Sequence, residues 1–186
     1  GGCSFDQNTA GSGGATYQES DHTTIHACSF TGNTAPSGRG GALYFDYETH
    51  AVIENNLFVE NVARYGGAVS CKGFTEDGPV LDRNLFESNH AVYEFGSYGG
   101  AVVCSDFAKP VLTRNIFRHN TVSPPVSLSI PRLSSGGPIS VDSAQPIIGG
   151  APGMGNLFED NAATPGADLF GVNLGAPLDA RYNTFT

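Results

Sequence analysis

The sequence contains few charged residues and no long apolar segment, and these absences narrow its class. Charged side chains make up 15% of the 186 residues, against roughly 25% in average proteins. No apolar run approaches the roughly 18 residues that a membrane-spanning helix needs. A formal net charge of -9 provides no basic surface, so we expect no nucleic-acid partner. With 39% hydrophobic residues, the chain can still bury a core.

The motifs of common catalytic sites are also missing. The five histidines are scattered, and none falls in a spacing such as H-E-x-x-H. There is no nucleophile-elbow motif, no phosphate loop and no dinucleotide fingerprint. The sequence therefore predicts no catalytic residue.

A repeat with a period of about 28 residues occupies nearly the whole chain. Its marker is a phenylalanine followed three residues later by an asparagine. A second asparagine stands two residues before the phenylalanine, except in the first two copies, which have cysteine there. A Gly-Gly-Ala block follows each of the first four copies. The marker phenylalanines are Phe5, Phe30, Phe58, Phe86, Phe117, Phe158 and Phe185.

Stacked coils explain why side-chain identity repeats at matched positions. Paired Gly, Pro and Asn in each period exclude helices. In a coil stack, equivalent residues lie about 4.8 Å apart, so phenylalanines stack and asparagine amides bond from rung to rung. Asparagine also tolerates the left-handed backbone of a sharp corner, and the paired Gly supplies a second corner where a Cβ would clash. We predict an all-β, right-handed parallel β-helix of about six to seven coils with three short strands per coil.

The repeat resembles that of the polymorphic outer-membrane protein family, whose signatures are G-G-A-[ILV] and F-x-x-N. It is also similar to the repeats of secreted bacterial right-handed parallel β-helix proteins. Gly41-Ala42-Leu43, Gly67-Ala68-Val69 and six F-x-x-N copies carry this resemblance. It implies the same fold but leaves function open, because such coils occur in adhesins, passenger domains, enzymes and inert stalks.

We expect one domain over residues 1–186, with inserted loops at about 92–98 and 122–135. Both loops leave the same corner and should lie side by side. Phe95 in the first loop and Val126, Leu128 and Ile130 in the second would form a partner-contact surface, unless they pack on the coil body.

The ends of the chain suggest two further interpretations. The chain has no initiator Met and ends within a repeat, so we expect a fragment or processed part of a longer chain with flanking domains. Because Phe5 and Phe185 occupy the same phase, copies could instead stack head to tail into a filament.

The strand after Gly-Gly-Ala carries two mostly apolar columns that should face inward. The column between them should face solvent, and it contains Tyr17, Tyr44, Ser70, Val103 and Ser140. The four cysteines form two pairs, Cys3 with Cys28 and Cys71 with Cys104, on adjacent coils. The spacing of adjacent rungs fits a disulfide, and stacked buried thiols are the alternative.

The turn after this strand is acidic in every complete coil. Its oxygen ligands would suit Ca²⁺, the one cofactor considered, or a polysaccharide, and Tyr17 and Tyr44 would supply a surface on which sugars stack. The alternative is a solvated turn in which Asp bonds locally to the backbone. The candidate carboxylates are Asp21, Asp46, Glu48, Asp77, Asp106 and Asp142.

Two classes of function remain. The first is a non-catalytic extracellular or cell-surface β-solenoid with a structural or adhesion role, whose partners would be further copies, flanking domains, polysaccharide or a host cell surface. The second is a carbohydrate-active β-helix enzyme, a polysaccharide lyase or glycoside hydrolase, that uses the acidic edge. The regular ladder and the low-charge surface favour the first.

Overall fold

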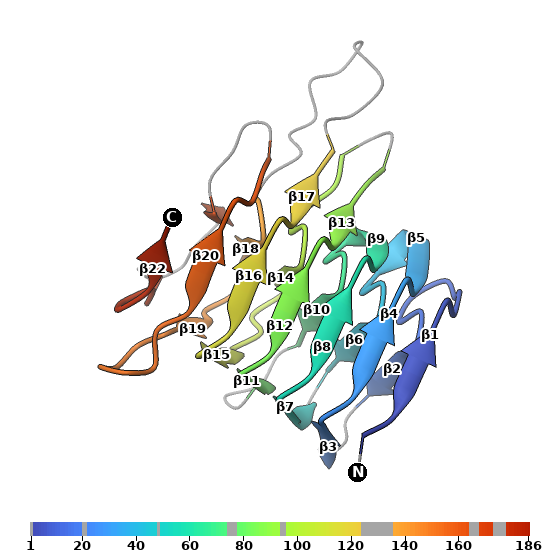
Figure 1. Cartoon of the computed structure of the whole chain (residues 1–186), viewed down its shortest axis with the longest axis horizontal. Helices are drawn as coiled ribbons and strands as arrows, with labels where there is room; N and C mark the ends of the chain where they lie inside the picture. The colour runs from blue at the N-terminus through green and yellow to red at the C-terminus, as the bar shows by residue number, and fades with distance from the viewer. Residues whose placement is uncertain are drawn as a thin grey trace.

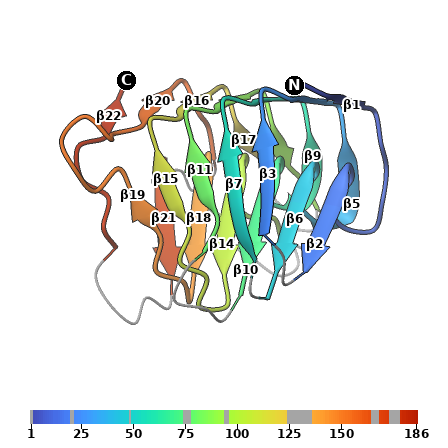
Figure 2. The same ribbon diagram turned by 90° about the horizontal axis from the view of Figure 1, so that it is seen from below.

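The computed structural model describes residues 2–19, 22–47, 49–73, 78–93, 96–123, 136–163, 168–172 and 178–186. Within these residues every pairing between named strands is parallel, and consecutive strands of one sheet are one coil apart in sequence. The strands wind into one right-handed parallel β-helix, which Figures 1 and 2 show from two sides. The predicted fold class is confirmed.

Four sheets run along the stack, and a coil contributes at most one strand to each sheet. Sheet A carries the marker phenylalanines and consists of β1 (Ser4–Asp6), β4 (Ser29–Thr31), β8 (Leu57–Val59), β12 (Leu85–Glu87), β16 (Ile116–Arg118), β20 (Leu157–Glu159) and β22 (Thr184–Phe185). Sheet B is short and consists of β5 (Thr34–Arg39), β9 (Val62–Tyr65), β13 (His90–Ala91) and β17 (Thr121–Val122).

The other two sheets follow the paired glycines. Sheet C consists of β2 (Thr16–Glu19), β6 (Leu43–Asp46), β10 (Val69–Lys72), β14 (Val102–Ser105), β18 (Ile139–Asp142) and β21 (Leu169–Val172). Sheet D consists of β3 (His22–His26), β7 (His50–Glu54), β11 (Val80–Asp82), β15 (Val111–Thr113) and β19 (Ile147–Ile148).

The strands form about five turns, slightly fewer than the six to seven predicted. The reason lies in the terminal rungs: among the described residues, sheet A has seven strands, whereas sheet D has five and sheet B has four. Sheet B is also a fourth strand position that the predicted three strands per coil omitted. Two of its strands contain only two residues, too few to show an alternating pattern.

A ladder of stacked phenylalanines fills the core behind sheet A. The rings of Phe58 and Phe86, and those of Phe86 and Phe117, have centroids 4.8 Å apart and are nearly parallel. These three side chains, together with Phe30 and Phe158, are fully buried. The register pairs each phenylalanine with the next along sheet A, which confirms the predicted stacking.

Two ladders of buried asparagines flank sheet A. At Asn61, the side-chain Nδ2 donates to Asn89 Oδ1 at 2.9 Å and to the Phe30 carbonyl at 2.9 Å. The backbone N–H of Asn61 donates to the same Oδ1 at 3.0 Å. Each amide therefore holds three rungs together, as the sequence predicts. The left-handed backbone, however, belongs to the preceding residue, as at Glu60 (φ 54°) and Asn55 (φ 56°), and not to the ladder asparagine.

The paired glycines form the corner that enters sheet C. A Cβ on Gly41 would lie 2.1 Å from the carbonyl oxygen of Gly67 on the next coil. Gly40 adopts a φ of 60°, which is costly for residues with a Cβ. The predicted need for glycine here is confirmed, since both backbone conformation and coil spacing exclude larger residues.

The prediction for the outer face of sheet C is correct for Tyr17, which is 49% exposed, but wrong for most of the column. Tyr44, Ser70, Val103 and Ser140 are buried. Side chains from the end of sheet B cover this face: Arg39 Nη1, for example, donates to Ser105 Oγ at 3.0 Å. No helix in the described part of the chain is long and apolar enough to cross a membrane.

Candidate functional site on the outer face of sheet C

Three tyrosines gather around one carboxylate at the N-terminal end of this face. Tyr17 and Tyr44 occupy matched positions on β2 and β6, and their ring centroids are 5.1 Å apart. Tyr47 follows β6 at a φ of 54° and is 47% exposed. Since Tyr17 is also about half exposed, the two rings present an aromatic surface at the edge of sheet C.

Asp46 fixes this arrangement. Its Oδ2 accepts a hydrogen bond from the Tyr44 hydroxyl at 2.6 Å, and its Oδ1 accepts one from the Tyr47 N–H at 3.0 Å. Lys72 Nζ lies 3.4 Å from Oδ1 and 5.7 Å from the centre of the Tyr47 ring. Burial raises the pKa of Tyr44 most, and the hydrogen bond to Asp46 raises it further. This hydroxyl therefore remains a donor at neutral pH. Both oxygens of Asp46 are therefore engaged within the protein.

The described carboxylates do not form a continuous stripe. Glu19 and Asp46 are register partners, but Lys72 and Ser105 occupy the next two rungs before Asp142. Asp106 lies one residue beyond this column at a φ of 53°. Local bonding also accounts for part of the turn, because Ser143 Oγ donates to Asp142 Oδ1 at 3.0 Å.

Several predicted site residues lie outside the described residues, namely Asp21, Glu48, Asp77, Phe95, Val126, Leu128 and Ile130. The predicted contact surface on the two inserted loops therefore stays a prediction. Within the described ranges, no three His, Cys, Asp or Glu side chains are grouped to hold a metal ion. A Ca²⁺ site that includes the undescribed carboxylates also stays a prediction.

A second group of side chains lies on this face and was not predicted from the sequence. Arg39, Tyr65 and Tyr98 occupy one column at the sheet B side, where Arg39 pairs with Tyr65 in register and Tyr65 bridges to Tyr98. The Arg39 guanidinium lies 4.9 Å from the Tyr65 ring centre, and the Tyr65 and Tyr98 rings stack at 5.8 Å. We call these three residues the arginine–tyrosine column. Each of the three residues directly precedes a glycine pair, and this shared position is the sequence signal that could have predicted the column.

A pocket of about 230 Å³ separates this column from the C-terminal half of sheet C. Ser140 lines it and is 1% exposed, and its Oγ makes no hydrogen bond within the described structure. Burial is the largest influence on Tyr65 and raises the pKa of its hydroxyl. Most of the side chains that line the pocket are polar, and its phenolic wall stays neutral. It is lined from the column by Arg39, Tyr65 and Tyr98 and from sheet C by Val103, Ser105, Ser140 and Asp142.

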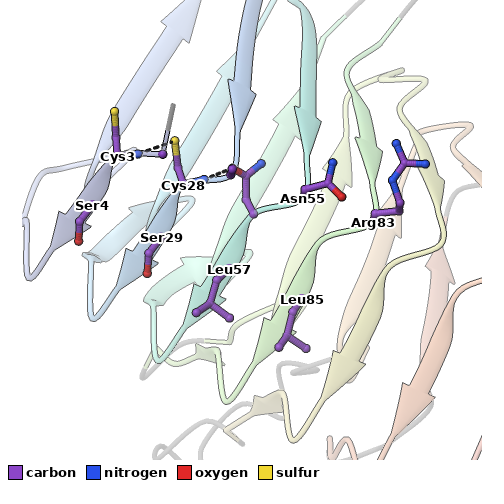
Figure 3. A pocket seen from close by; sticks show the side chains of 11 residues that line it. Cys3, Ser4, Cys28, Ser29, Asn55, Leu57, Arg83 and Leu85 are labelled. Carbon is purple, nitrogen blue, oxygen red and sulfur yellow. Dashed lines mark hydrogen bonds between the residues drawn. The ribbon is translucent and has the colours of Figure 1, made fainter.

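The cysteine groove, named for Cys3 and Cys28, lies on another side of the molecule, at the corner between sheets D and A (Figure 3). The Cys3 N–H donates to Cys28 Sγ at 3.3 Å, and the Cys28 N–H donates to Asn56 Oδ1 at 2.8 Å. The two cysteines thus occupy the first two positions of one asparagine ladder, and Cys28 Sγ accepts the backbone hydrogen bond that an asparagine Oδ1 accepts on the later rungs. Cys71 and Cys104 are buried register partners in sheet C. Cys71 and Cys104 are free thiols in this structure, and both disulfides stay predictions.

A third groove crosses the outer face of sheet D. His22 and His50 stack there with ring centroids 4.8 Å apart, beside a floor that includes Val52 and Ile147, each 40% exposed. Lys109 also lines this groove. His22 and His50 are register partners of β3 and β7, so the strand pairing brings the two rings together.

Comparison with known proteins identifies the family of this chain. Residues 2–122, about two thirds of the chain, match the family model described as "right handed beta helix region". No curated protein and no solved structure matches the sequence. The match agrees with the stacked parallel strands described above. The chain belongs to the right-handed β-helix family.

Proposed function

We propose that the chain is a non-catalytic extracellular or cell-surface β-solenoid with a structural and adhesion role, which contacts polysaccharide through the outer face of sheet C. The resemblance of its repeats to those of polymorphic outer-membrane proteins supports the cell-surface location. Head-to-tail stacking of copies stays a prediction, which sedimentation over a range of concentrations would test.

The observation that carries this proposal is the environment of Asp46. It lies beside the exposed tyrosines, yet it is 6% exposed and bonded to Tyr44, Tyr47 and Lys72. A general acid or base must reach the proton that it transfers. A carboxylate held in this way instead orders aromatic rings, and ordered rings suit contact with the apolar faces of sugars.

The second candidate function, a polysaccharide lyase or glycoside hydrolase, is favoured by one observation. Glu19 is exposed and is the register partner of Asp46, and glycoside hydrolysis uses two carboxylates at a defined separation. This function would require Asp46 to exchange its present partners for a substrate.

Binding to a panel of immobilised acidic and neutral polysaccharides tests the proposal. We expect binding, and we expect Tyr17→Ala combined with Tyr47→Ala to weaken it about tenfold through lost ring contacts. Tyr182→Ala is the matched control, because Tyr182 is 56% exposed but lies beside sheet A. Equal loss in both variants would contradict the proposal. Release of reducing ends or unsaturated products from the panel would favour the enzyme instead.

A further inference from the structure

We propose that the pocket beside the arginine–tyrosine column binds one sugar unit that carries a carboxylate, namely a uronic acid residue of an acidic polysaccharide. This inference rests on the proposed function and names the ligand class and the subsite. At about 230 Å³, the pocket has the volume of roughly eight water molecules. That is comparable with one sugar ring and too small for several.

Arg39 provides the positive charge. One of its guanidinium nitrogens donates to Ser105 Oγ, and the group carries five N–H donors in all. Among the described residues, no carboxylate lies within ion-pair distance of Arg39. Arg64 stacks on the same Tyr65 ring at 4.6 Å and adds a second cation nearby. A planar guanidinium matches the two oxygens of a carboxylate.

Ser140 is a second indication, independent of Arg39, that the pocket binds a ligand. Its hydroxyl is buried, lines the pocket and has no hydrogen-bond partner within the described structure. Such groups are rare in native proteins and call for an explanation. A hydroxyl both donates and accepts, so a sugar hydroxyl would satisfy it. Asp142, exposed at the rim, accepts hydrogen bonds and suits a further sugar hydroxyl.

These groups together favour a hydroxylated acid over simpler ligands. Arg39 favours a ligand with a carboxylate over a neutral sugar. Asp142 can accept a hydrogen bond from a hydroxyl but repels a second carboxylate, so a hydroxylated acid suits the pocket better than a simple carboxylate. The net charge of -9 disfavours anions at long range. At physiological salt, however, charges beyond about 8 Å are largely screened, so the local field is set by the groups at the pocket, Arg39 and Asp142, with Arg64 nearby.

Calorimetric titration with a trimer of galacturonic acid, and separately with the neutral galactose trimer, tests the subsite. We expect the acidic trimer to bind more tightly, and Arg39→Gln to weaken its binding about tenfold or more. Arg118→Gln is the matched control, because Arg118 lies in sheet A and pairs with Glu87. It should leave the affinity unchanged.

Ser140→Ala separates a ligand contact from a structural role. Because the hydroxyl bonds to none of the residues that the structure describes, its removal should leave the unfolding midpoint unchanged while weakening binding several-fold. Ser70→Ala is the control, since Ser70 Oγ is equally buried and unbonded but Ser70 does not line the pocket. Ser70→Ala should therefore leave the affinity unchanged.

Two results would overturn the subsite. The first is equal affinity for the acidic and neutral trimers, and the second is acidic-trimer binding that neither Arg39→Gln nor Ser140→Ala weakens. If polysaccharide binding then still depends on Tyr17 and Tyr47, the proposed function survives without this subsite. If no saccharide binds at all, both proposals fail.

Discussion

Replacing one ladder asparagine tests how much the amide stack contributes to stability. Asn89 is fully buried in the middle of the stack. Its Oδ1 accepts the backbone N–H of Asn61 at 3.0 Å and the Asn61 Nδ2 at 2.9 Å. Its own Nδ2 donates to the Phe58 carbonyl and to Asn120 Oδ1. Asn89→Ala therefore removes four hydrogen bonds.

The expected loss follows from the groups that remain behind. Two buried donors of Asn61 lose their acceptor, and each unsatisfied buried group costs about 1–3 kcal/mol. We therefore expect Asn89→Ala to lower the free energy of unfolding by roughly 2–6 kcal/mol. That is a large part of the roughly 5–15 kcal/mol of a typical domain.

Urea unfolding followed by far-UV circular dichroism measures this loss, with coincidence of a second probe as the check on two-state behaviour. Asn8→Ala is the matched control, because Asn8 belongs to the same ladder but is exposed on the first rung. We expect it to cost under about 1 kcal/mol. Equal losses in the two variants would refute the argument that the buried amides hold the coils together.

Three further predictions concern the glycine corner, the thiols and acid stability. Gly67→Ala places a Cβ 2.1 Å from the carbonyl oxygen of the next coil, so we expect little folded protein by circular dichroism; a native spectrum and unfolding midpoint would contradict this. Burial raises the pKa of Cys71 well above its ordinary value and that of Cys104 to about 12. Ellman's reagent should thus not label Cys71 and Cys104 before unfolding, and labelling of either in the native protein would show the buried pair to be accessible. Burial alone would raise the pKa of Asp82, but hydrogen bonds from its arginine and threonine partners hold it below the ordinary value. The stability that Asp82 adds is therefore present at neutral pH and lost as pH falls below about 4. Melting temperatures between pH 2 and 7 should fall less steeply for Asp82→Asn, and an unchanged slope would count against this role.

The repeated side chains made the main register predictable. Residues of the same type as Phe86, Asn89 and Gly99 recur at matched positions because stacking puts equivalent residues in contact. The repeat in the sequence therefore shows which residues touch on adjacent coils. The left-handed corner residues were harder to predict. At Glu60, Ser88 and Asp160 the backbone is left-handed, but the residue type varies, because backbone stacking and not the side chain fixes that conformation.

The candidate site was predictable only in part. The matched positions of Tyr17 and Tyr44 placed both on sheet C, and the structure brings them together. Their exposure differs because Tyr44 is buried and bonds to Asp46, a contact that strand alternation does not encode. Arg39 reaches Ser105 across 66 residues of sequence, and no local pattern predicts a contact over that separation.

A crystal structure of the chain with a bound galacturonate trimer tests the account most directly, because it locates the ligand. We predict an intact trimer on the outer face of sheet C, with one carboxylate against Arg39 and a hydroxyl bonded to Ser140. A trimer bound on another face, such as the groove of His22 and His50 on sheet D, or cleaved products at Asp46, would contradict it.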